Sequence, residues 1–108
     1  QRCGSHLASA TDLDESQKAG ETAVKKAVAG SSGCMIAFVR ADSGEYSVSY
    51  EAKEIAKIAN AVRHVPRGFI TEDGSNVTDD CLEYIKPLIS GEVITRFDGG
   101  LPIHFVID

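Results

Sequence analysis

Hydrophobic and small residues in the first third of the chain recur with the period of an α-helix. We predict a helix starting at Asp12, because Asp12 and Glu15 have the spacing of a capping box and put acidic groups where the helix dipole favours them. Gly30 is expected to end this helix, since glycine tolerates the left-handed conformation found at helix C-termini. The stripe that should pack against a neighbour consists of Leu13, Ser16, Gly20, Ala23, Val24 and Ala27.

Two short stretches after this helix have the patterns of strands. Residues 34–39 form a continuous apolar run, which is typical of a strand buried on both faces inside a sheet. After a turn at residues 42–44, Tyr46, Val48 and Tyr50 alternate with polar residues, which indicates a strand with one solvated face. The short turn predicts that the two strands form an antiparallel hairpin, with the tyrosines as packing residues.

The second half of the chain predicts two further helices. Helical spacing of apolar residues favours a helix over residues 52–62, which Pro66 would end. Thr78 is expected to cap the next helix, while Pro87 should kink it and Gly91 should end it. The apolar stripes are Ile55, Ile58, Ala59 and Val62 in the first of these helices, and Leu82, Ile85, Leu88 and Ile89 in the second.

The last residues predict a turn and a final strand. Gly99 and Gly100 form the turn signal, and Ile103, Phe105 and Ile107 follow at alternate positions. Mixed helices and strands indicate an α/β fold, and a length of 108 residues suits a single domain.

Composition excludes several classes of function. The formal net charge of −5 repels the phosphate backbone of a nucleic acid, so we expect no nucleic-acid partner. No apolar run approaches the roughly 20 residues of a membrane-spanning helix, so no membrane role is expected. The three cysteines, Cys3, Cys34 and Cys81, are odd in number and widely spaced, which favours a reduced, cytoplasmic protein. Cys3 and His6 supply only half of a zinc site, and no metal site is predicted in this chain.

Arg2 is the first candidate for a binding residue. Its planar guanidinium presents five donors that suit a phosphate or a carboxylate, and Gly4 lets the backbone approach a ligand closely. Taken alone, an arginine in this setting is more often a solvated surface residue. His64, beside Arg63 and Arg67, is likewise interpreted as a surface residue, because no nucleophile or carboxylate accompanies it in the sequence.

Several motifs together resemble the phosphofructokinase superfamily, in its branch rich in pyrophosphate-dependent enzymes. The opening, from Gln1 to Ser9, is similar to the family's Q-R-x-G-x-H-x-A-S segment. Two positions depart from the pattern: Ser5 stands where this branch often has arginine, and Gly68 stands where glutamate is usual. The other matching stretches, in the expected order, are residues 58–60 (I-A-N), 65–70 (V-P-R-E-[WF]-I), 74–78 (G-N-x-V-T-E-E), 84–92 (Y-x-x-P-L-I-x-G-E) and 100–102 (G-L-P).

The resemblance implies a fold and an activity. It implies that residues 1–108 form a single C-terminal segment of a phosphofructokinase-type sandwich, with a strand hairpin and packed helices. The parent enzyme would be a transferase, a cytoplasmic and homo-oligomeric 6-phosphofructokinase of glycolysis. It would use pyrophosphate, or ATP in the alternative branch, to convert fructose 6-phosphate to fructose 1,6-bisphosphate, with Mg²⁺ bound by parts of the enzyme outside this segment.

The resemblance also implies residue roles. Arg2 matches the arginine that binds the 6-phosphate of fructose 6-phosphate, and Gln1 lies in the same motif as a secondary contact. His6 occupies a motif position to which we assign no role. No catalytic residue is predicted, because the family's phosphate-donor loop and catalytic aspartate motif are not in this sequence; the chain alone should be inactive. Since it starts without Met inside a motif, we expect a longer polypeptide. The competing hypothesis is a free-standing, non-catalytic α/β module for ligand binding or interaction.

Overall fold

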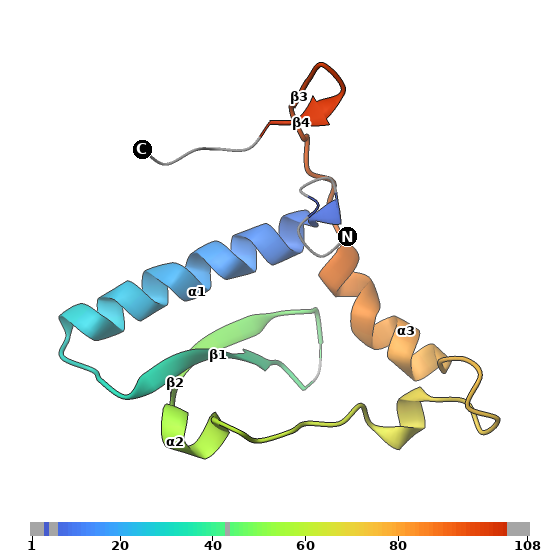
Figure 1. The fold of residues 1–108 in the computed structure, drawn as a ribbon. Coiled ribbons are helices and arrows are strands. Elements are labelled where there is room, and N and C mark those ends of the chain that lie inside the picture. The colour runs from blue at the N-terminus through green and yellow to red at the C-terminus, as the bar shows by residue number, and fades with distance from the viewer. Residues whose placement is uncertain (1–3, 5–6, 43, 104–108) are drawn as a thin grey trace.

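Helix α1, Ala10–Val28, is the longest element of the computed structural model, which describes residues 4, 7–42 and 44–103 (Figure 1). The helix starts earlier than predicted, and its N-cap is Ser9 instead of Asp12. Ser9 is extended (φ −92°, ψ 157°), and its hydroxyl accepts a hydrogen bond from the Asp12 N–H at 3.1 Å. Asp12 therefore lies inside the first turn as an acidic residue. The predicted end is confirmed, since Gly30 has φ +89° directly after the C-cap Ala29.

The predicted hairpin is confirmed. Strand β1, Cys34–Arg40, pairs antiparallel with β2, Val48–Glu54, in a register that runs from Cys34 opposite Glu54 to Arg40 opposite Val48. Phe38 lies opposite Tyr50, and their ring centroids are 5.5 Å apart in an edge-to-face arrangement. The hairpin lies along one side of α1 (Figure 1).

The prediction that β1 is buried on both faces is wrong for the described part of the chain. Met35 is 45% exposed and Phe38 is 51% exposed. The physical reason is the small size of the sheet: within the described residues β1 has β2 as its neighbour and nothing on its other edge. The apolar sequence of β1 is typical of a central strand. The described residues, however, do not include the elements that would pack on both of its faces.

The helix predicted over residues 52–62 is also largely wrong. Strand β2 continues through Glu54, and only a single turn, α2, Ile55–Ile58, follows. Pairing with β1 takes residues 52–54 into the hairpin despite their helical spacing, and the Ile55 N–H donates to the Gly33 carbonyl at 2.9 Å. After α2 the chain leaves the helical path, with Asn60 at φ +63°.

The helix predicted after Thr78 is confirmed in position. A 3₁₀ turn, η2, Arg67–Phe69, precedes α3, Asp79–Ile85, which continues as the 3₁₀ turn η3, Lys86–Ile89. Pro87 lies where the α-helix changes to 3₁₀ geometry, in agreement with the predicted interruption. Thr78 occupies the N-cap position but does not make the predicted capping bond; its hydroxyl donates instead to the Gly68 carbonyl at 2.8 Å.

The chain's last described residues form a second, smaller hairpin. Strand β3, Phe97–Asp98, pairs antiparallel with β4, Leu101–Pro102. The predicted turn is confirmed: Gly99 and Gly100 have φ values of +56° and +86°, the two positive values of a type I′ turn. Ile103 follows β4 outside a strand, and Phe105 and Ile107 of the predicted last strand lie outside the described residues.

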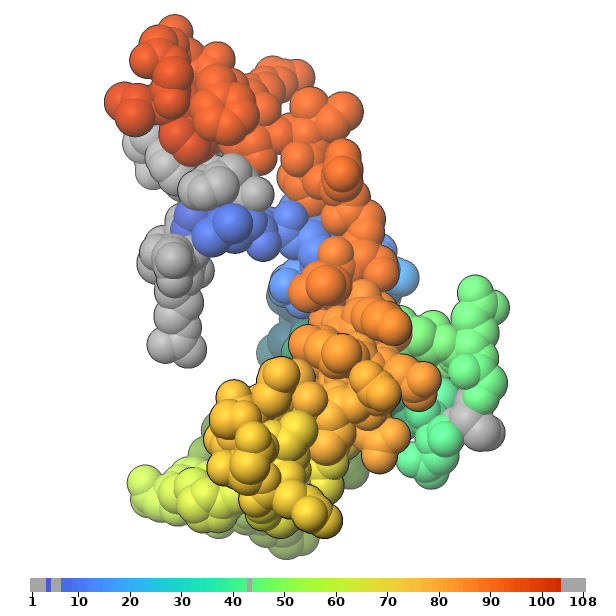
Figure 2. Space-filling model, turned by 90° about the vertical axis from the view of Figure 1, so that its right-hand side faces the viewer, coloured from blue at the N-terminus to red at the C-terminus, as the bar shows by residue number. Residues whose placement is uncertain are grey.

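No hydrophobic side chain in the described part of the chain is buried. The predicted buried stripe of α3 and η3 is exposed: Leu82 by 39%, Ile85 by 36% and Ile89 by 72%. The radius of gyration is 17.4 Å, against about 13 Å for a compact domain of this length. Figure 2 shows the same extended shape, with the β3–β4 hairpin at one end and the segment before α3 at the other. These apolar faces need cover from outside the described residues.

We expect the isolated 108-residue chain to bind a hydrophobic dye such as ANS strongly or to self-associate. Exposed apolar patches well beyond a few hundred Å² are rare on stable monomers. Fluorescence titration and sedimentation would measure both properties on the same sample. A monodisperse monomer that unfolds cooperatively and does not increase the fluorescence of the dye would contradict this expectation.

Candidate functional site

The start of α1 is bound by a segment 79 residues further along the chain. The segment is residues 88–91, part of the stretch that resembles the family's Y-x-x-P-L-I-x-G-E motif, and Ser9 ends the motif at the opening. Four hydrogen bonds join the two: Ser9 Oγ to the Leu88 carbonyl at 2.6 Å, Ala10 N to the Gly91 carbonyl at 3.0 Å, and Thr11 N and Oγ1 to the Ser90 carbonyl at 3.3 and 3.1 Å. Two separate motifs thus form one structural unit.

These bonds occupy the N–H groups that a helix N-terminus usually offers to anions. The first two N–H groups of α1 donate to the 90–91 carbonyls, Asp12 N–H donates to Ser9 Oγ, and Leu13 N–H donates to the Ser9 carbonyl at 3.2 Å. A phosphate can bind to a helix N-terminus only where such donors are free. A phosphate beside α1 therefore needs a cationic side chain as its partner.

Gly91 permits the close approach of the two segments. A Cβ atom placed on Gly91 would lie 2.6 Å from the Cβ of Ala10, and Gly91 has φ +82°. Both the space and the backbone conformation therefore require glycine at this position.

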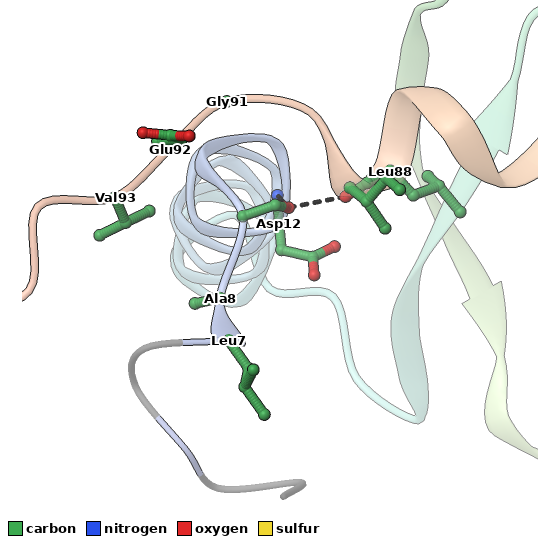
Figure 3. A pocket seen from close by; sticks show the side chains of 9 residues that line it. Leu7, Ala8, Asp12, Leu88, Gly91, Glu92 and Val93 are labelled. Carbon is green, nitrogen blue, oxygen red and sulfur yellow. Dashed lines mark hydrogen bonds between the residues drawn. The ribbon is translucent and has the colours of Figure 1, made fainter.

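A hollow of about 440 Å³ lies beside this junction (Figure 3). Figure 3 shows the chain passing over the first turn of α1 at Gly91, with Leu88 on one side of the helix and Val93 on the other. Ser9, at 7% exposure, is the one buried polar residue among those described. The hollow is lined by Leu7, Ala8, Ser9, Asp12, Leu88, Ile89, Gly91, Glu92 and Val93.

The hollow has two carboxylates, those of Asp12 and Glu92, among mostly apolar neighbours. Ionised carboxylates accept hydrogen bonds from hydroxyl groups, such as those of a sugar, and repel a phosphate. A phosphorylated ligand here would again need a nearby arginine or lysine to bind its charged end.

The predicted binding residues Gln1 and Arg2 lie outside the described residues, as do Cys3 and His6. Their roles remain predictions. The described chain reaches back towards them through Leu7, whose N–H donates to the Gly4 carbonyl at 2.9 Å. Sequence reasoning missed Ser9, although a signal was present: Ser9 and Asp12 have the N-cap to N3 spacing, and the prediction started the helix three residues too late.

A second cluster joins the β1–β2 hairpin to α1 and to α3. The Arg40 guanidinium lies 4.7 Å from the ring centroid of Tyr46 and 4.5 Å from that of Tyr84, and its Nη1 donates to the Tyr84 carbonyl at 2.7 Å. Tyr46 OH donates to Glu15 Oε1 of α1 at 2.6 Å. Partial burial and this bond to Glu15 raise the pKa of Tyr46 to about 12, so the phenol keeps its proton at neutral pH. The interpretation of Tyr46 as a packing residue agrees with these contacts.

The stretches that resemble V-P-R-E-[WF]-I and G-N-x-V-T also form one unit. Arg67 donates to three backbone carbonyls, those of Ile70, Thr71 and Glu72, at 2.9, 3.0 and 3.2 Å. Hydrogen bonds from Ser75 and Thr71 lower the pKa of the Asp73 carboxyl to about 2. The Arg67 donors are therefore used to shape this turn, and His64 nearby is exposed.

Among the described residues, no group of three His, Cys, Asp or Glu side chains is placed to hold a metal ion. In the same part of the chain, no helix is long and apolar enough to cross a membrane.

Curated relatives of the chain are named pyrophosphate–fructose 6-phosphate 1-phosphotransferase. The protein from Halomonas elongata is 42% identical over 102 residues, which make up 94% of this chain and 24% of the relative. The protein from Methylococcus capsulatus is 37% identical over 107 residues, or 99% of this chain and 26% of the relative. The chain therefore spans about a quarter of the length of the curated relatives it matches. No family model matches it.

Solved structures of the same kind share the fold. The crystal structure of the pyrophosphate-dependent phosphofructokinase from Nitrosospira multiformis matches with a TM-score of 0.81 and 38% identity, over 90% of this chain and 24% of that one. The corresponding enzyme from Marinobacter aquaeolei also has a TM-score of 0.81 and 38% identity, over 91% of this chain and 25% of that one. The predicted α/β fold with a strand hairpin is confirmed.

The chain belongs to the phosphofructokinase superfamily, as its ordered motifs predict. Within that superfamily, the relatives and solved structures that it resembles are the pyrophosphate-dependent enzymes.

Proposed function

We propose that the protein containing this chain is a pyrophosphate-dependent 6-phosphofructokinase. It transfers a phosphoryl group from pyrophosphate to the 1-hydroxyl of fructose 6-phosphate and forms fructose 1,6-bisphosphate, the phosphofructokinase step of glycolysis. The observation that carries this proposal is the match of nearly the whole chain to relatives that all bear this name. The same names favour pyrophosphate over ATP as the donor.

In this proposal the chain supplies part of the sugar-phosphate site. Arg2 binds the 6-phosphate, and Gln1 makes a secondary contact. Two features of the structure support a role for an arginine here: the N–H groups at the start of α1 already have partners, and the adjoining hollow contains the carboxylates of Asp12 and Glu92. Positive charge for the phosphate therefore has to come from a side chain.

Binding of the 6-phosphate assists catalysis because it orients the 1-hydroxyl of the sugar towards the phosphoryl donor. Phosphoryl transfer depends mainly on orientation and on stabilisation of charge, and a sugar held at one end presents its other end to the donor in a fixed direction. The apolar residues of the hollow, Leu7 and Leu88 among them, would lie against the apolar faces of the bound sugar.

Mg²⁺ would neutralise charge on the pyrophosphate when bound. The described residues do not form a site for it, since they include no cluster of three suitable ligands, and we propose that the ion is held by parts of the enzyme outside this chain. We also propose a cytoplasmic homo-oligomer, as the resemblance implies.

The full-length protein should form fructose 1,6-bisphosphate from fructose 6-phosphate, pyrophosphate and Mg²⁺, whereas the 108-residue chain alone should form none. The reason for the second expectation is that the donor loop and the catalytic aspartate are not in this sequence. An aldolase-coupled assay of both proteins, with ATP replacing pyrophosphate in a parallel series, measures the rates. Product formed with ATP alone would overturn the assignment of the donor, and turnover that follows the short chain through purification would overturn its inactivity.

A further inference from the structure

Ser9 makes one hydrogen bond more than a helix N-cap needs. Its hydroxyl accepts from the Asp12 N–H at 3.1 Å, which is the ordinary capping bond. The same hydroxyl donates to the Leu88 carbonyl at 2.6 Å, 79 positions away. A serine hydroxyl has a single proton to donate, and here it is used to bind a separate segment of the chain. The capping bond stabilises α1, whereas the donated bond fixes where α1 begins relative to η3.

The start of α1 is fixed in rotation as well as in position. Three consecutive residues, Ser9, Ala10 and Thr11, donate to the carbonyls of residues 88, 91 and 90. Because successive residues point in different directions around a helix axis, bonds from three of them restrict both sliding and rotation of the first turn. Ser9 is only 7% exposed, and the residues that bury it belong to this chain. The junction therefore does not depend on a surface that other parts of the enzyme would cover.

The segment before Ser9 carries the residue that is proposed to bind the 6-phosphate. Arg2 stands seven positions before Ser9. Between these positions the Leu7 N–H donates to the Gly4 carbonyl at 2.9 Å, a bond that shortens the reach of the segment. A short segment passes a shift of its anchored end on to the residues before it, and a misplacement of about 1 Å is enough to weaken an oriented contact.

We propose that Ser9 is a positioning residue for fructose 6-phosphate: its bond to Leu88 fixes the segment that carries Arg2. The inference rests on the proposed function and on the role of Arg2 in it. Ser9 acts through Arg2 and makes no contact of its own with the substrate. Loss of its hydroxyl should therefore change the affinity for the sugar phosphate and leave the affinity for the donor as it is.

The test is initial-rate kinetics of the full-length protein with substitutions at Ser9. Ser9→Ala should raise the Michaelis constant for fructose 6-phosphate by about two- to tenfold, the factor for the net loss of one hydrogen bond, with no change in the constant for pyrophosphate. A purely structural loss would lower the amount of active enzyme and change neither constant. Ser9→Thr keeps the hydroxyl and should restore most of the affinity. Ser9→Gly, which an N-cap position tolerates better than alanine, should give the same rise and keeps the test available if Ser9→Ala does not fold.

A double variant, Ser9→Ala together with Arg2→Ala, shows whether Ser9 acts through Arg2. If it does, Ser9→Ala should add nothing to the Michaelis constant of Arg2→Ala. The matched control is Thr78→Ala. Thr78 is also an N-cap residue whose hydroxyl donates to a carbonyl outside its helix, that of Gly68 at 2.8 Å, but it lies at the start of α3, at the other end of the α3–η3 segment from Leu88. Thr78→Ala should lower the melting temperature and leave both Michaelis constants unchanged.

Four results would each overturn the inference: a wild-type constant for fructose 6-phosphate in Ser9→Ala, an equal rise in Thr78→Ala, no recovery in Ser9→Thr, or a full further rise in the double variant. The wild-type rate in the same assay reports separately on the proposed function. Turnover of fructose 6-phosphate with pyrophosphate would support that function even if every Ser9 variant behaved like the wild type. A wild-type protein without this turnover would overturn the function and the inference together.

Discussion

Arg2→Ala in the full-length protein should raise the Michaelis constant for fructose 6-phosphate by about ten- to a hundredfold. A bidentate, charge-assisted contact to a phosphate contributes about 1.5–3 kcal/mol, which corresponds to that range. The N-terminus of α1 cannot compensate, because its N–H groups are already bonded to residues 88–91 and to Ser9. Initial-rate kinetics at saturating pyrophosphate measure the change.

The matched variant for this experiment is Arg2→Lys. It keeps the charge and loses the planar fork, so its Michaelis constant should fall between those of wild type and Arg2→Ala. The constant for pyrophosphate should change little in either variant, because the donor reacts at the opposite end of the sugar. Unchanged fructose 6-phosphate kinetics in a folded Arg2→Ala protein would show that Arg2 is a solvated surface residue.

Gly91→Ala should destabilise the full-length protein by about 2–5 kcal/mol. The left-handed backbone conformation costs an alanine about 1–2 kcal/mol, and inserting a methyl group into a filled space costs about 1–3 kcal/mol more. The new Cβ would lie 2.6 Å from the Cβ of Ala10, so the segment 88–91 would have to move away from α1. Urea denaturation followed by circular dichroism reports the loss.

Gly30→Ala is the control for the strain alone. Gly30 also has a positive φ, +89°, but an added Cβ would meet nothing within 4 Å. Its replacement should cost only the conformational part, about 1–2 kcal/mol. Equal losses of stability in the two variants would mean that Gly91 does not hold two segments in close contact.

Elements whose cause is local could be predicted from the sequence. Gly30 ends α1 and Gly99-Gly100 forms a tight turn, because glycine, which has no Cβ, adopts positive φ values without a steric penalty. The β1–β2 hairpin follows from an apolar stretch and an alternating stretch joined by a short turn. Each of these predictions depended on residues within a few positions of one another.

Features that depend on distant partners could not be predicted in this way. The Ser9 hydroxyl donates a hydrogen bond to the Leu88 carbonyl, 79 positions away, and no pattern in the residues around Ser9 predicts this bond. Residues 52–54 have helical spacing and nevertheless extend β2, because their partners in β1 are available. The exposure of Phe38 and Ile89 has the same origin, since the residues that would cover them are not in the described chain. The family motifs supplied the one long-range signal, and the structure shows that Ser9 of the first motif is bonded to Leu88 of the fifth.

The most direct test of the central claim is a crystal structure of the full-length protein with fructose 6-phosphate bound. If this chain supplies part of the sugar-phosphate site, the Arg2 guanidinium should lie about 2.7–2.9 Å from oxygens of the 6-phosphate, the distance of charge-assisted hydrogen bonds. The sugar should then lie against the hollow that contains Asp12 and Glu92. A 6-phosphate bound wholly by residues outside this chain, with Arg2 facing solvent, would contradict the account.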